Sequence, residues 1–173
     1  MHGMNWRGCY LTQIKLVLDA NVWVFGLFQK HPHFTLLQKS FPEESAVNLI
    51  IDSYGVVETL HVVRRVAKQS HKSHETVEKA FWSILNQASC TLDFEYPLKK
   101  DLKHLMRNKP EFLMLARIFD LEPKDVPYLV LSFKHQAILV TEDYRSLYAR
   151  REQIKSLLKV EICSVQEILL SLD

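Results

Sequence analysis

Residues 15–28 read KLVLDANVWVFGLF and place a short apolar run directly before the carboxylate of Asp19. Such a run is typical of a strand that is buried on both faces of a parallel sheet. An ionised carboxylate is costly to bury unless it is paired or bound to a metal. Asp19 therefore either caps the helix expected after the strand or belongs to a charged site at the end of the strand.

A second apolar run, AILVTED at residues 137–143, also ends in acids, because Thr141 is followed by Glu142 and Asp143. The carboxyl ends of parallel strands lie along one edge of the sheet, and ligand sites of open α/β folds form there. If the two strands are neighbours, Asp19 and Asp143 converge at that edge.

Two further acids are expected at the same edge, since the amino ends of the crossover helices point toward it. Asp125 stands directly before Val126 and Pro127, and a proline at this position is typical of a first helical turn. Glu58 lies one turn into the helix that is expected after NLIIDS at residues 48–53. Four carboxylates at one edge cannot all be ionised without a countercharge, which Mg²⁺ or Mn²⁺ supplies as an oxygen-preferring cation. Such a cation suits phosphodiester or phosphate-ester hydrolysis.

The order of the apolar patterns predicts a single α/β domain. We expect strands at residues 14–18, 46–52, 137–143 and 160–163, with helices between them, whereas residues 90–97 read as either strand or loop. We also expect Ser53 to cap the helix after the second strand and one helix to run over residues 144–158. Strands separated by helices imply a central parallel sheet with helices on both faces. The domain is predicted to span residues 14–173, after an N-terminal extension over residues 1–13.

Composition is that of one globular domain, with 173 residues, 47% hydrophobic and 24% charged side chains. The net charge of +2 is too small to indicate nucleic-acid binding, so any basic surface must come from local clusters. Three cysteines without a C-x-x-C pair favour a reducing compartment. We find no signal-peptide or membrane-spanning pattern in the sequence, and therefore expect a cytoplasmic protein. The sequence lacks G-x-G-x-x-G and G-x-x-x-x-G-K motifs, which excludes the usual nucleotide-binding loops.

Each acid also has an ordinary structural explanation. Asp19 and Asp125 are suited to cap helices, since Asp is a favoured residue at the N-cap. Glu58, near Arg64 and Arg65 in the sequence, is typical of a solvated or salt-bridged helix residue. The joint pattern, four acids in order on the appropriate element ends, favours a common site.

Four segments together resemble the motifs of PIN-domain ribonucleases, the VapC-like proteins, in order and spacing. They are KLVLDANVWVFGLF, SYGVVETLHVVRR, KDVPYLVLSFKHQ and AILVTEDYRSL. The resemblance spans about residues 14–170. It implies a parallel sheet with helices on both sides and metal-dependent cleavage of RNA by a ribonuclease.

The resemblance also implies roles for particular residues. A divalent ion, Mg²⁺ or Mn²⁺, would be bound by Asp19, Glu58, Asp125 and Asp143. Asn21 and Thr141 would be polar supports, and Glu142 an additional acid. Candidate contacts to RNA come from three basic clusters, which are Arg64, Arg65 and Lys68, then Lys99, Lys100 and Lys103, and finally Arg145, Arg150 and Arg151. Each of these is also compatible with an ordinary solvated helix face.

The family resemblance further implies frequent homodimers, and many small members are the toxin half of toxin–antitoxin pairs, so an antitoxin is an expected partner. We expect a dimer face around Trp23, Phe28 and Phe34. The alternative function is a catalytically silent RNA- or protein-binding module that has the same fold. A phosphatase with an aspartate nucleophile is disfavoured, because Asn21 stands where its second aspartate would be.

Overall fold

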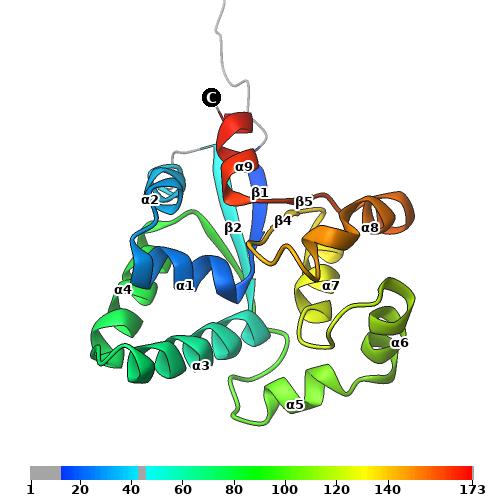
Figure 1. The fold of residues 1–173 in the computed structure, drawn as a ribbon, viewed down its shortest axis with the longest axis horizontal. Coiled ribbons are helices and arrows are strands. Elements are labelled where there is room, and N and C mark those ends of the chain that lie inside the picture. Colours follow the sequence, from blue (N-terminus) through cyan, green and yellow to red (C-terminus); the bar gives the residue numbers. More distant parts are fainter. Residues whose placement is uncertain (1–12, 43–45, 173) are drawn as a thin grey trace, which may run out of the picture.

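The computed structural model describes residues 13–42 and 46–172, and all structural statements below concern these residues (Figure 1). The predicted N-terminal extension, residues 1–13, lies almost wholly outside them. The first strand begins at Ile14, the predicted start of the domain.

Within the described residues, five parallel strands form one sheet in the order β3-β2-β1-β4-β5. The strands are β1 (Ile14–Leu18), β2 (Val47–Asp52), β3 (Cys90–Asp93), β4 (Ile138–Val140) and β5 (Ile162–Cys163). The condition for convergence of Asp19 and Asp143 is met, because β1 pairs with β4 and Leu18 lies opposite Val140. The strand order reverses between these two strands, and this reversal point is where open α/β sheets form ligand crevices.

Helices connect the strands and cover both faces of the sheet, as predicted (Figure 1). They are α1 (Ala20–Gln29), α2 (Pro32–Gln38), α3 (Ser53–Gln69), α4 (His74–Gln87), α5 (Leu102–Arg107), α6 (Pro110–Phe119), α7 (Val126–His135), the short 3₁₀ helix η1 (Tyr148–Arg150), α8 (Arg151–Leu158) and α9 (Val165–Leu172).

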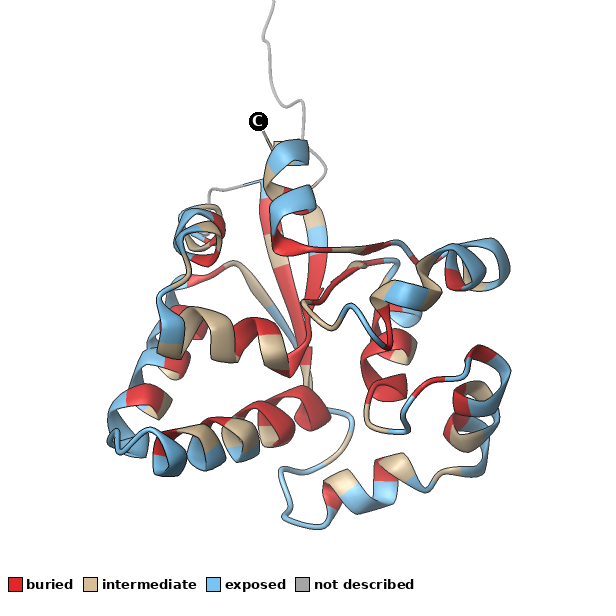
Figure 2. Cartoon of the chain, viewed as in Figure 1, coloured by how far each residue is buried: buried red, intermediate tan, exposed pale blue. Residues whose placement is uncertain are grey.

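Successive residues of the central strand β1 enter different cores, as the period-two geometry of a strand requires. Leu16 and Leu18 pack in the core made with α1, α2, α4 and α9. Val17 packs in the opposite core, which contains buried residues of α5, α6, α7 and α8. Figure 2 shows the result: β1 is largely buried, and exposed residues lie mainly on the outer sides of the helices.

Two local predictions are wrong. Ser53 does not cap α3, because its hydroxyl donates to the carbonyl of Tyr96, and the cap is Asp52, which accepts from the Gly55 amide at 2.7 Å. Residues 144–158 do not form one helix. The carboxylate of Asp143 accepts the amides of Arg145 and Ser146 at 3.0 and 3.1 Å, so the chain turns there before η1 and α8.

The undecided segment at residues 90–97 begins with a strand, β3, whose four residues pair with β2. The expected dimer face also needs correction. Trp23 and Phe34 are each only 2% exposed and belong to the core, where the Trp23 ring contacts Phe34 and Phe81 edge to face. In the described part of the chain, no helix is both long and apolar enough to cross a membrane.

The closeness of α1 and α2 predicts that Gly26→Ala destabilises the protein. An added methyl group would overlap the ring of Phe34. Overpacking costs about 1–3 kcal/mol, whereas Ala in an unobstructed helix is better than Gly by about 1 kcal/mol. Urea denaturation measures the difference. Because the cost comes from the ring, the same change in a Phe34→Ala background should be neutral or stabilising, and an equal cost in both backgrounds would contradict this packing.

Candidate functional site

The predicted acids line one cavity of about 390 Å³ at the reversal point of the sheet. Asp19 follows β1, Asp143 follows β4, Asp125 precedes α7, and Glu58 lies in α3. A backbone hydrogen bond from the Asp19 amide to the Val140 carbonyl, at 3.0 Å, joins the two strand ends. The topology therefore brings all four carboxyl-bearing residues to one place.

Asp19 and Asp125 occupy N-cap positions without capping their helices. Neither side chain makes a capping hydrogen bond. Asp52, at the same position before α3, does cap its helix through the Gly55 amide. Helix capping therefore explains Asp52 but not the two buried acids of the cavity, which are 6% and 3% exposed.

The hydroxyl of Thr141 connects the two strand ends. It donates to a carboxylate oxygen of Asp19 at 2.9 Å and accepts from the Asp143 amide at 3.0 Å. Asn21 donates to the same hydroxyl at 3.5 Å, and its own carbonyl oxygen accepts from the Glu142 amide at 3.2 Å. Asn21 and Thr141 thus fix the position of Asp19, the kind of contact expected of polar supports.

Burial and mutual repulsion disfavour the ionised forms of two acids. Burial, followed by the nearby carboxyl of Asp125, raises the pKa of Asp19 to about 7, although the Thr141 hydrogen bond opposes the shift. Burial also raises the pKa of Asp125 to about 6, with Ser146 donating to its carboxylate at 2.6 Å and opposing the shift. Since a cation would stabilise the ionised forms, both groups are suited to hold one.

Glu58 lies in a different electrostatic environment. One oxygen of its carboxylate contacts the Arg107 guanidinium at 2.9 Å and the Lys103 ammonium at 3.0 Å. These contacts are ion pairs rather than aligned hydrogen bonds, since this oxygen has no hydrogen-bond partner among the described residues. The expectation that only a metal balances the four acids is therefore wrong for Glu58, because the protein supplies its countercharge.

The other predicted residues are divided between the cavity and the outer surface. Arg65 lines the cavity, whereas Arg64 pairs with Glu78 through two hydrogen bonds at 2.7 and 3.1 Å. Lys68 and Arg145 are exposed and do not line this cavity.

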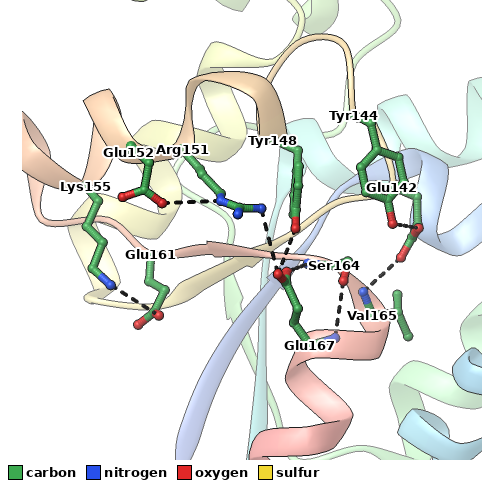
Figure 3. Close-up of polar contacts among 10 residues, drawn as sticks. All are labelled: Glu142, Tyr144, Tyr148, Arg151, Glu152, Lys155, Glu161, Ser164, Val165 and Glu167. Atoms are coloured by element: carbon green, nitrogen blue, oxygen red, sulfur yellow. Dashed lines mark hydrogen bonds and ion pairs between the residues drawn. The ribbon is translucent and has the colours of Figure 1, made fainter.

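Glu142 also lies outside the cavity lining and is not an additional acid there. It accepts from the Val165 amide at 2.8 Å and from the Tyr144 hydroxyl at 2.9 Å, so it fixes the start of α9 instead (Figure 3).

Comparison with solved structures gives matches that cover most of the chain. PAE2754 from Pyrobaculum aerophilum has a TM-score of 0.60 and 19% identity, over 96% of this chain and 93% of that chain. VapBC2 from Rickettsia felis, solved bound to a DNA fragment from their promoter, has a TM-score of 0.53 and 13% identity, over 87% and 98%. FitAcB from Neisseria gonorrhoeae has a TM-score of 0.50 and 16% identity, over 87% and 98%.

The chain has the PIN-domain fold. This agrees with the resemblance in the four sequence segments and with the parallel sheet described above. No family model matches the sequence, and no curated protein matches it.

The donor chemistry of the PIN-domain cavity fits a hard divalent cation. Within residues 13–42 and 46–172, no group of three His, Cys, Asp or Glu side chains is arranged to bind one metal ion. The fit comes from three aspartates whose charges repel one another. The hydroxyl of Tyr128, a buried residue of the lining, also has no hydrogen-bond partner among the described residues. A buried hydroxyl normally has a partner, and a bound water or ligand oxygen would supply one.

Several residues of the site were not predicted. Ser146 supports Asp125, and Lys124, Arg107 and Tyr128 line the cavity. The sequence contains weak signals for some of them. Tyr128 lies one helical turn after Asp125, and Arg107 stands four residues after the candidate RNA contact Lys103, a spacing that places both on one helix face.

The raised pKa of Asp19 predicts how stability without metal depends on pH. Between pH 3.8 and about 7 the folded protein binds more protons at Asp19 than the unfolded chain does. Stability therefore falls as pH rises through this window, by at most about 1.4 kcal/mol per pH unit for one group. In EDTA, Asp19→Asn should flatten this decline and be at least as stable as the wild type above the window.

Urea denaturation below, inside and above the window measures this effect. Asp101→Asn is the matched control, because Asp101 is exposed and also precedes a helix without capping it. The control should follow the wild-type curve. An Asp19→Asn curve parallel to the wild type would contradict the electrostatic description of the cavity.

Proposed function

We propose that this protein is a divalent-metal-dependent endoribonuclease that hydrolyses phosphodiester bonds in RNA. The observation that supports it most is the meeting of Asp19, Asp125 and Asp143 in one cavity. They come from three different element ends, and the first two leave their helices uncapped. The PIN-domain fold also supports the proposal of a nuclease.

The residues of the cavity have distinct proposed roles. Asp19, Asp125 and Asp143 would hold Mg²⁺ or Mn²⁺, with Glu58 as the fourth acid of the site. Such an ion, when bound, polarises a phosphoryl oxygen and lowers the pKa of a bound water. Thr141 and Ser146 orient the carboxylates of Asp19 and Asp125 through hydrogen bonds of 2.9 and 2.6 Å. Carboxylates that are oriented by hydrogen bonds in this way would keep their geometry when the metal binds.

A catalytically silent PIN-fold module that binds RNA or protein is the second candidate. The observation in its favour is the ion pairing of Glu58, which engages one of the four acids with Lys103 and Arg107. The two functions differ in a measurable way. The enzyme binds metal and cleaves RNA, whereas the silent module binds RNA without cleaving it.

We also propose that the protein is the toxin of a toxin–antitoxin pair, with an antitoxin protein as partner, and that it forms homodimers in the cytoplasm. The support is similarity of fold to VapBC2, which was solved bound to a DNA fragment from their promoter, and to FitAcB. The dimer face must differ from Trp23 and Phe34, because both are buried in the core.

The nuclease proposal predicts cleavage of single-stranded RNA with Mg²⁺ or Mn²⁺ and none with EDTA. Asp125→Asn should abolish cleavage, because it removes one carboxylate of the proposed metal site. Gel analysis of a labelled RNA measures the products, and the Asp101→Asn control should cleave like the wild type. Cleavage that survives both EDTA and Asp125→Asn would refute a metal-dependent mechanism at this site.

Metal binding should also be visible as stability. A ligand that binds only the folded state at a hundredfold excess over its dissociation constant adds about 2.7 kcal/mol to the free energy of unfolding. We expect Mn²⁺ to stabilise the wild type in this way. Asp19→Asn and Asp125→Asn should gain much less. Thermal denaturation with and without Mn²⁺ decides, and equal shifts in all three proteins would eliminate this metal site.

A further inference from the structure

The cavity contains as many lysine and arginine side chains as acidic ones. Its lining includes the acids Asp19, Glu58, Asp125 and Asp143 and the cations Arg65, Lys103, Arg107 and Lys124. The three aspartates lie at strand and helix ends beside the sheet, whereas two of the cations come from helix α5. The acidic part suits a metal ion, but the basic part has no role in metal binding.

Lys103 and Arg107 form the best-defined cation pair of this basic part. They are four residues apart on α5, and both contact one oxygen of Glu58, at 3.0 and 2.9 Å. Their side chains remain 17% and 29% exposed, while that of Glu58 is 9% exposed. One carboxylate cannot neutralise two cations, so the trio retains a net positive charge beside the cavity.

Arg107 is also oriented by a second contact. Its Nε atom donates to the Tyr54 hydroxyl at 3.0 Å, and its guanidinium lies 5.9 Å from the centre of the Tyr54 ring. The Tyr54 hydroxyl in turn donates to the Lys124 carbonyl at 2.9 Å. The guanidinium is thus held at the cavity while retaining further N–H donors, since an arginine carries five.

We propose that Lys103 and Arg107 bind a backbone phosphate of the RNA, and that Glu58 holds the two cations in place until the RNA arrives. The inference rests on the proposed function, because it takes RNA to be the ligand of the cavity. A phosphodiester carries one negative charge and two non-bridging oxygens, which arginine binds through paired N–H donors and lysine as a point charge.

The position of Glu58 explains how its carboxylate can occupy the two cations until a phosphate replaces it. Two cations at i and i+4 on a helix repel each other. The Glu58 carboxylate offsets this repulsion and limits the motion of two long side chains. A phosphate offers the same charge with more acceptors, so it competes with Glu58 for the same donors. Glu58 therefore opposes RNA binding in the absence of metal.

The test measures binding of a fluorescently labelled single-stranded RNA by anisotropy, in EDTA, over a series of KCl concentrations. Without metal no cleavage is required, so the result does not depend on the nuclease proposal. Each lost phosphate contact makes the slope of log K against log salt shallower by about 0.7 for a single strand. Lys103→Gln should weaken binding and reduce the slope by this amount. Lys79→Gln, at an exposed lysine of α4 outside the cavity lining and outside the candidate basic clusters, should change neither.

Glu58→Gln should change the affinity for RNA in the opposite direction. It should tighten metal-free RNA binding more than Asp143→Asn does, although both remove one charge from the same cavity. Tighter binding cannot result from partial unfolding, so this variant also controls for folding. Equal effects of the two variants, or a Lys103→Gln slope identical to the wild type, would overturn the proposal.

A free phosphate ion has the same chemistry as a backbone phosphate, and a second measurement separates them. Thermal denaturation compares sodium phosphate with sodium chloride at equal ionic strength. If phosphate stabilises the wild type but not Lys103→Gln, while the salt slope for RNA is the same in both proteins, the site binds free phosphate and the RNA assignment is refuted.

Discussion

The hydrogen bond from Thr141 to Asp19 depends on the pairing of β1 with β4, and the remainder of the site depends on this bond. Leu18 and Val140 are partners in the sheet, so the next residues of each strand, Asp19 and Thr141, must emerge side by side. The same hydroxyl accepts the Asp143 amide and so fixes the turn that carries the third aspartate. A one-residue shift in strand register would reverse every side chain of β1. Core packing of Leu16 and Leu18 therefore also determines where the acid lies.

The acids of the cavity differ in how their charges are balanced, and this difference distinguishes the proposed metal-binding residues from the proposed phosphate-binding residues. Asp19 and Asp125 are stabilised by neutral hydroxyl donors and have raised pKa values, so they favour the arrival of a cation. Glu58 already contacts two cations from α5. The proposed divalent ion and the proposed RNA phosphate, with opposite charges, would therefore be bound in one cavity by different residues. Phosphodiester hydrolysis requires both to be close together.

The sequence was informative wherever a local pattern determined the outcome. Apolar runs that stop at Asp19 and before Asp143 predicted two buried parallel strands, and the acid positions followed once the structure placed these strands side by side. Lys103 belongs to one of the basic clusters of the sequence, but its contact with Glu58 was not predictable, since this contact joins α5 to α3, far apart in the sequence. Arg64, Lys68 and Arg145 stay predicted RNA contacts, but they do not line the cavity, because the basic clusters did not show which side of each helix faces it. Glu142 adjoins Asp143, yet alternation along the chain directs it to α9.

The ion pairs of Glu58 also bear on how the two layers of the PIN-domain fold meet. Helix α3 and helix α5 lie at the same end of the molecule, on either side of the central strands (Figure 1). Burying a carboxylate with its cations costs desolvation, and apolar residues of similar size often stabilise a protein equally well or better. Stability alone thus gives no reason for two cations and one acid at this point. A ligand that brings its own negative charge does give a reason, because the cations must be present before it binds and must be held apart from the aspartates that we propose to bind metal. Glu58 meets both requirements, since it lies in α3 and contacts both cations of α5 through one oxygen.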